Sequence, residues 1–91
     1  MPKLSVIIPV YNVENYLEKC LDSVIYPELE DYEIILVNDG STDSSGSICA
    51  EYAARFPALV RVITTENGGL GHARDVGIDA AAGKYLLFLD S

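Results

Sequence analysis

The sequence is poor in positive charge, in cysteine and in long apolar runs. Its 91 residues include 6 Lys and Arg against 14 Asp and Glu, which gives a formal net charge of −8. This balance argues against nucleic acid and anionic membrane surfaces as partners. It also means that a phosphate-bearing ligand would need a metal ion or a well-placed Arg beside it.

The 2 cysteines, Cys20 and Cys49, lack the paired spacing of a metal or redox motif. Both fall on apolar faces of expected helices, so we predict buried, reduced thiols in a cytoplasmic protein. No apolar run approaches the length of a membrane span, and the first residues do not resemble a signal peptide. Contact with the inner face of a membrane would therefore depend on regions downstream of this chain.

The composition, 49% apolar and 22% charged, is typical of one small globular domain. Apolar runs and helical spacing alternate along the chain. Asn12 is expected to be the N-cap of the first helix and Pro27 to stop it, and Gly83 is expected to form the C-cap of the third. The predicted strands are 4–10, 34–37, 60–64 and 85–89, and the predicted helices begin near residues 13, 43 and 70. This alternation predicts an α/β fold with a Rossmann-like parallel four-stranded sheet.

Residues 32–43 contain the most informative run. Residues 34–37 are apolar without alternation, which indicates a central strand covered on both faces. The run ends at Asn38-Asp39-Gly40, at the carboxyl end of that strand, where ligands of open parallel sheets bind. Asp39 is therefore a candidate ligand-binding residue. Equally, Asp39 and Asp43 could serve only to shape the turn and cap the following helix.

The other predicted strands also end in polar residues. Tyr11-Asn12 follows the first strand, Glu66-Asn67 follows the third, and Asp90 follows the fourth. Because parallel strands deliver their carboxyl ends to one edge of the sheet, these side chains are expected to meet there. The sequence thus predicts a ligand site at this edge.

Four motifs in this order resemble the family 2 glycosyltransferases. They are residues 6–12 (VIIPVYN), residues 37–43 (VNDGSTD), residues 67–70 (NGGL) with Ala73-Arg74, and residues 89–91 (LDS). The resemblance implies a GT-A fold with strands in the spatial order third, second, first, fourth. It makes residues 1–91 the nucleotide-sugar-binding part of that domain, ending inside an Asp-x-Asp motif.

The same resemblance assigns roles to individual residues. Pro9, Tyr11 and Asn12 would line the nucleotide pocket, with the Tyr11 ring near the base. Asp39 would accept a hydrogen bond from a base N–H, as a carboxylate can. Asn67 would belong to the same site, and Arg74 would help to hold the nucleotide and diphosphate.

Asp90 matches the first acid of the Asp-x-Asp motif, which binds a divalent cation in this family. Mn²⁺ or Mg²⁺ would bridge the diphosphate of the sugar donor, for which a UDP-sugar is favoured. The implied reaction is an inverting transfer of the sugar to a hydroxyl of a saccharide or lipid-linked acceptor. The catalytic base of the family lies further downstream, so no residue of this chain is assigned that role and the chain alone is expected to be inactive.

Two other functions fit parts of the sequence. One is a nicotinamide-dinucleotide domain, because Gly69-Leu70-Gly71 follows a strand and opens a helix; however, Arg74 occupies the third glycine position of that fingerprint. The other is a non-catalytic module that binds a nucleotide or a partner. The isolated chain is also expected to self-associate as a dimer. The contact would be made by its fourth strand, at an open edge of the sheet, or by the sheet face that a single helix cannot cover.

Overall fold

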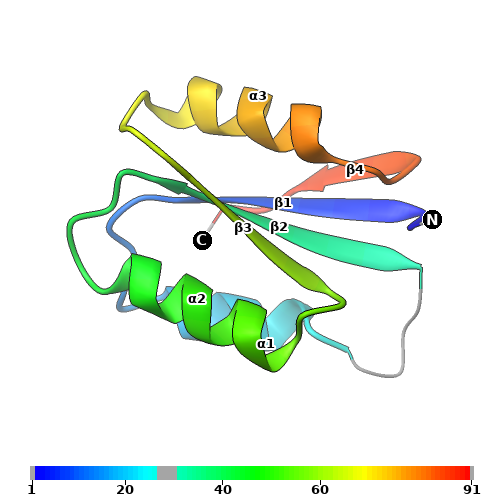
Figure 1. The fold of residues 1–91 in the computed structure, drawn as a ribbon, viewed down its shortest axis with the longest axis horizontal. Helices are drawn as coiled ribbons and strands as arrows, with labels where there is room; N and C mark the ends of the chain where they lie inside the picture. Colours follow the sequence, from blue (N-terminus) through cyan, green and yellow to red (C-terminus); the bar gives the residue numbers. More distant parts are fainter. Residues whose placement is uncertain (1, 27–30, 91) are drawn as a thin grey trace.

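The computed structural model describes residues 2–26 and 31–90. Strands and helices alternate strictly along the chain, as the sequence predicted (Figure 1). Their bounds are β1 Leu4–Val10, α1 Leu17–Val24, β2 Tyr32–Asp39, α2 Ser45–Arg55, β3 Val60–Thr65, α3 Leu70–Ala80 and β4 Tyr85–Phe88. Pro27, which was expected to stop α1, lies outside the described residues.

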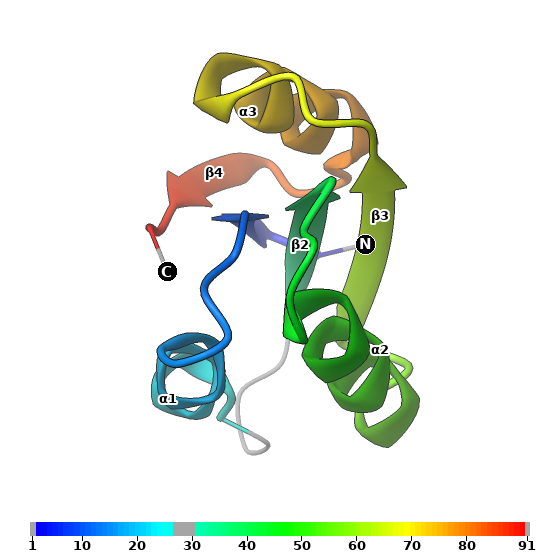
Figure 2. The same ribbon diagram turned by 90° about the vertical axis from the view of Figure 1, so that its left-hand side faces the viewer.

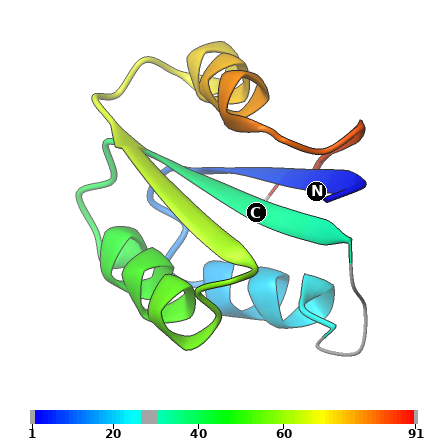
Figure 3. The same ribbon diagram turned by 45° about the vertical axis from the view of Figure 1, so that its right-hand side comes forward.

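All neighbouring strands are parallel, and their order in the sheet is β3-β2-β1-β4. This order is the one that the family resemblance implied. Helices α1 and α2 lie on one face of the sheet and α3 on the other (Figures 2 and 3). The carboxyl ends of the strands consequently share one edge of the sheet, where the predicted site residues lie.

The apolar run of β2 is covered on both faces, as its lack of alternation predicted. Ile34 and Leu36 pack into the larger core under α1 and α2, whereas Ile35 and Val37 pack under α3. Helix α3 lies close to the sheet because Gly77 has no side chain there. A Cβ at that position would overlap Ile7 Cγ2 of β1.

Two helix ends differ from the prediction. The first helix was expected from Val13 with Asn12 as its N-cap, but α1 begins at Leu17. Asn12 is instead in the left-handed region at φ 50°, and its side chain bonds a different segment of the chain. These hydrogen bonds hold Asn12 in a non-helical conformation, so the helix does not begin directly after it.

The end of α3 also departs from the prediction, since Gly83 is not its C-cap. The helix ends at Ala80, and the C-cap residue Ala81 is extended. Two backbone groups explain this early end: Ala82 N donates to Glu33 Oε2, and Gly83 N donates to Ser5 Oγ. The chain leaves the helix to satisfy these two acceptors on the sheet.

The two cysteines are free thiols. Cys49 is buried in the core under α2, as predicted, and burial raises the pKa of its thiol to about 11. Cys20 is only half-buried. Burial also raises the pKa of the Cys20 thiol, so neither side chain is an activated nucleophile.

Candidate functional site

A cavity of about 370 Å³ lies at the carboxyl edge of the sheet. Its lining includes five of the seven residues that the sequence analysis assigned to the site: Pro9, Tyr11, Asp39, Asn67 and Asp90. They come from the ends of β1, β2 and β4 and from the loop between β3 and α3. Residues far apart in the sequence therefore meet where parallel sheets bind ligands.

Asp39 is the most constrained group of this cavity, with only 3% of its surface exposed. Its Oδ1 accepts hydrogen bonds from Thr65 Oγ1 at 3.1 Å and from Gly68 N at 3.0 Å, and its Oδ2 accepts one from Gly69 N at 2.9 Å. Burial alone would raise the pKa of Asp39, but these hydrogen bonds outweigh it and hold the pKa below its usual value. Asp39 is therefore an ionised acceptor at neutral pH.

Gly40 allows the loop before α3 to approach this carboxylate. Its φ is +72°, and a Cβ there would lie 2.7 Å from the backbone nitrogen of Asn67. Any other residue would be strained and would push Asn67 away. The glycine that the sequence analysis assigned to a turn thus also brings two loops into contact.

Tyr11 is partly exposed at the mouth of the cavity, with 47% of its surface accessible. An exposed phenol ring offers a flat apolar surface on which a nucleobase can stack. Its position fits the sequence-based assignment better than a role in filling the core.

Arg74 does not line the cavity, but it contacts Asp90, which does. Arg74 Nη2 lies 3.9 Å from Asp90 Oδ1, and the guanidinium stands over the ring of Phe88 at 5.8 Å. The Nε of Arg74 is buried without a hydrogen-bond partner. The arrangement places one positive charge at the rim of an acidic cavity, where an anionic ligand would otherwise be repelled.

Asn12 has a different environment from the one that the sequence suggested. It is absent from the cavity lining, and its Oδ1 accepts hydrogen bonds from Thr42 N at 2.8 Å and Asp43 N at 3.3 Å. In return, Asn12 N donates to Ser41 Oγ at 3.1 Å. The geometry gives Asn12 a part in joining the β1–α1 loop to the β2–α2 loop.

Further hydrogen bonds complete this junction between the two loops. Asp43 Oδ2 accepts from Glu14 N at 3.2 Å, and Glu14 Oε2 accepts from Ser44 N at 3.0 Å. Val13 N donates to Ser45 Oγ at 2.9 Å. Sequence reasoning missed these pairs because each joins residues about thirty positions apart, as their separations of 29 to 32 show. The only signal was the accumulation of Ser, Thr and Asp after Gly40.

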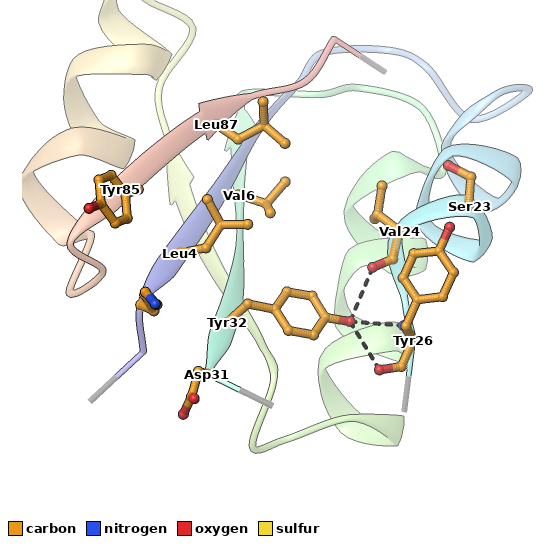
Figure 4. A pocket seen from close by; sticks show the side chains of 10 residues that line it. Leu4, Val6, Ser23, Val24, Tyr26, Asp31, Tyr32, Tyr85 and Leu87 are labelled. Carbon is orange, nitrogen blue, oxygen red and sulfur yellow. Dashed lines mark hydrogen bonds between the residues drawn. The ribbon is translucent and has the colours of Figure 1, made fainter. Parts of the chain in front are cut away.

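A larger cavity, of about 640 Å³, lies at the opposite end of the strands (Figure 4). Its walls are mainly aliphatic and aromatic, and Lys3 and Asp31 are the charged residues that line it. The Tyr32 hydroxyl accepts from Tyr26 N at 2.8 Å and donates to Val24 O at 3.1 Å, which fixes the end of α1. This cavity lacks the converging polar groups of the carboxyl edge, so its size does not make it the better candidate.

Two features are absent from the described ranges. None of the helices there has both the length and the apolar character that a membrane crossing requires. Within residues 2–26 and 31–90, no group of three or more His, Cys, Asp or Glu side chains is placed to hold a metal ion. If the carboxyl edge binds a cation, Asp90 needs additional ligands from outside this set.

Comparison with known proteins gives consistent matches. The sequence model of the family "Glycosyl transferase family 2" matches residues 5–91. The glycosyltransferase EpsJ of Bacillus subtilis (strain 168) is 52% identical over 90 residues, which are 99% of this chain and 26% of that protein. The chain thus spans about a quarter of the length of this relative.

Two solved structures have the same fold. TarS 1–349 of S. aureus in complex with UDP is 37% identical, with a TM-score of 0.83 over 98% of this chain and 27% of that one. The mannosyltransferase PcManGT of Pyrobaculum calidifontis, in complex with GDP-Man and Mn²⁺, is 29% identical, with a TM-score of 0.85 over 98% of this chain and 27% of that one. These likenesses confirm the predicted GT-A, Rossmann-like architecture.

Proposed function

Because this chain belongs to glycosyl transferase family 2, we propose that it binds the nucleotide part of a nucleotide-sugar donor. The sugar would pass, with inversion, to a hydroxyl of a saccharide or lipid-linked acceptor. The observation that carries this proposal is the convergence of Tyr11, Asp39, Asn67 and Asp90 on one cavity at the carboxyl edge. The structural relatives support it, since one holds UDP and another GDP-Man. A dinucleotide function gains no support, because Arg74 stands where that fingerprint needs a glycine.

The residues that line the cavity, and Arg74 at its rim, have roles that their environments favour. The Tyr11 ring would stack on the base, next to Pro9 of the same wall. Asp39, an acceptor held in place by three hydrogen bonds, would accept the base N–H. Arg74 would move from Asp90 to the diphosphate, whose greater negative charge attracts the guanidinium more strongly. Asn67 lines the same cavity and would contact the sugar moiety of the nucleoside.

A divalent cation fits this edge only together with the ligand. Asp90 is exposed at the cavity and supplies a hard carboxylate oxygen, and the diphosphate would supply further oxygens. When bound, Mn²⁺ or Mg²⁺ would neutralise charge on the leaving diphosphate. The role of this chain is then to orient the nucleotide so that its diphosphate lies beside Asp90. We assign the role of catalytic base to no residue of this chain.

We expect Mn²⁺ to raise UDP affinity several-fold and to bind only weakly without UDP. Calorimetric titration of UDP into the intact gene product that carries this chain, with and without Mn²⁺, measures both effects. Asp90→Ala should abolish the Mn²⁺ effect and leave metal-free UDP binding in place. Asp79→Ala, which removes the same charge from an exposed position of α3, is the control. A Mn²⁺ effect that survives in the Asp90 variant would remove Asp90 from the metal site.

For the isolated 91-residue chain, we propose self-association into a dimer through β4. This strand ends the sheet order, and each of its residues, from Tyr85 at 56% to Phe88 at 38%, is well exposed. Tyr85 N donates to Lys3 O and Leu89 N donates to Ile7 O. The N–H groups of Leu86 and Phe88, which alternate with them, therefore point away from the sheet. An edge of this kind can pair with a second copy of itself.

The test is light scattering on a size-exclusion column at moderate salt. The wild-type chain is expected to elute as a dimer and Leu86→Pro as a monomer, because proline removes an outward N–H without touching the β1 ladder. A wild-type chain that remains monomeric at high concentration would exclude pairing through β4.

Separately, the free Cys49 and Cys20 thiols support placing the protein in the reducing cytoplasm.

A further inference from the structure

Thr65 is a polar residue of the site that the sequence analysis did not single out. The register of the parallel pair β2–β3 places Thr65 directly beside Asp39, with both side chains on the same face of the sheet. The Thr65 hydroxyl donates a hydrogen bond to Asp39 Oδ1 at 3.1 Å. Thr65 is the last residue of β3, so the strand itself holds its side chain in this position.

The hydrogen bonds of Asp39 leave one direction for a ligand. An ionised carboxylate offers about four acceptor positions, two on each oxygen. Thr65 Oγ1 and Gly68 N occupy those of Oδ1, and Gly69 N occupies one of Oδ2. The remaining position belongs to Oδ2, and Asp39 itself lines the cavity. Because two donors hold Oδ1 and one holds Oδ2, the carboxylate is not free to rotate about its Cβ–Cγ bond.

We infer that Thr65 is a positioning residue that orients the Asp39 carboxylate and so selects nucleotides whose base presents a ring N–H. This inference rests on the proposed function of the cavity. Uracil and guanine carry a ring N–H at the edge that meets such an acceptor, whereas cytosine and adenine carry a lone pair there. A fixed carboxylate oxygen opposite that lone pair leaves two acceptors facing each other without a proton between them.

Removal of the Thr65 hydroxyl would loosen this selection. Valine has nearly the same shape and also favours a strand, so Thr65→Val removes the hydrogen bond while keeping the packing. Asp39 would then keep only its two backbone donors and could turn its oxygens away from the ligand. If the hydroxyl served only to stabilise the fold, Thr65→Val would lower the melting temperature without changing the preference between bases.

The experiment is calorimetric titration of UDP and CDP into the intact gene product that carries this chain, as wild type and as the variants Thr65→Val and Thr65→Ser. Wild type is expected to bind UDP at least about tenfold more tightly than CDP. Thr65→Val should bind UDP about fivefold more weakly and lose part of its discrimination against CDP. Thr65→Ser keeps the hydroxyl and should retain both the affinity and the preference for UDP.

The possible failures are distinguishable. If wild type prefers UDP and Thr65→Val keeps the same affinity and preference, the role of Thr65 is overturned while the proposed function stands. The same holds if Thr65→Ser loses as much as Thr65→Val, because the hydroxyl would then not be the relevant group. If wild type binds neither nucleotide, the proposed function fails, and the inference about Thr65 fails with it.

Discussion

Replacement of Asp39 by Ala is expected to weaken UDP binding at least about tenfold, since a hydrogen bond to a charged group contributes roughly 1.5–3 kcal/mol. The substitution removes the proposed hydrogen-bond acceptor for the base. It also leaves Thr65 Oγ1, Gly68 N and Gly69 N without the partner that holds the loop before α3. Both losses act on the same cavity, so the effect should exceed that of any other single substitution in its lining.

Calorimetry with UDP measures this loss, and thermal unfolding of the same variant shows whether the fold survives. Asp79→Ala removes an equal charge from an exposed helical position and should bind UDP like wild type. If the Asp39 variant is folded and binds UDP with wild-type affinity, Asp39 does not contact the nucleotide.

Replacement of Glu33 by Ala should cause a large loss of stability, about 2–4 kcal/mol. Glu33 is 8% exposed, and both of its carboxylate oxygens are bonded. Oε2 accepts from Ser5 Oγ at 2.6 Å and from Ala82 N at 2.7 Å, and Oε1 accepts from Arg61 Nη2 at 3.1 Å. Without Glu33, Ser5 Oγ and Ala82 N lose their acceptor. The connection between α3 and β4 then loses one of its attachments to the sheet, while the bond from Gly83 N to Ser5 Oγ remains.

Urea unfolding of Glu33→Ala and Arg61→Ala separates the two halves of this ion pair. The Arg61 side chain is 48% exposed, so its removal should cost less than about 1 kcal/mol. If both variants lose the same stability, the buried hydrogen bonds are not the source of the effect. A Glu33 variant as stable as wild type would show that solvent replaces the carboxylate at no cost.

The stability supplied by Glu33 should also depend on pH in a defined direction. Burial alone would raise the pKa of Glu33, but the hydrogen bonds from Ser5 and Ala82 and the charge of Arg61 lower it below its ordinary value. A carboxyl group with a lower pKa in the folded chain stabilises the fold above its unfolded pKa, and this contribution disappears as the pH falls through the folded pKa. The stability difference between wild type and Glu33→Ala should therefore shrink in acid, below about pH 4.5.

The sequence predicted most of the fold because its signals are local. The unbroken apolar run of β2 indicated cover on both faces, and Asn38-Asp39-Gly40 marked the end of that strand. The site was predictable to the same extent, since residues that directly follow strands must meet at one edge of a parallel sheet. The order of the strands came from the family resemblance and not from the pattern of residues.

What the sequence did not predict depends on contacts between distant segments. Asn12 was expected to be a helix cap, but its side-chain Oδ1 accepts hydrogen bonds from the backbone N–H groups of Thr42 and Asp43. Gly83 was expected to end α3, but the helix ends earlier because the backbone N–H groups of residues 82 and 83 donate to Glu33 and Ser5. Both helix ends depend on hydrogen-bond acceptors that come close only in the folded chain. The periodicity of apolar residues in the sequence does not indicate such contacts.

The proposed function requires a nucleotide to bind at the carboxyl edge of the sheet. A titration of UDP in the presence of the diamagnetic cation Mg²⁺, followed by the amide resonances in proton–nitrogen correlation spectra, tests this binding. The largest shifts are expected at Tyr11, Gly68 and Gly69, around the cavity that Asp39 lines. Shifts confined to Tyr26, Tyr32 and Tyr85 at the opposite end of the strands, or no shifts at all, would contradict it.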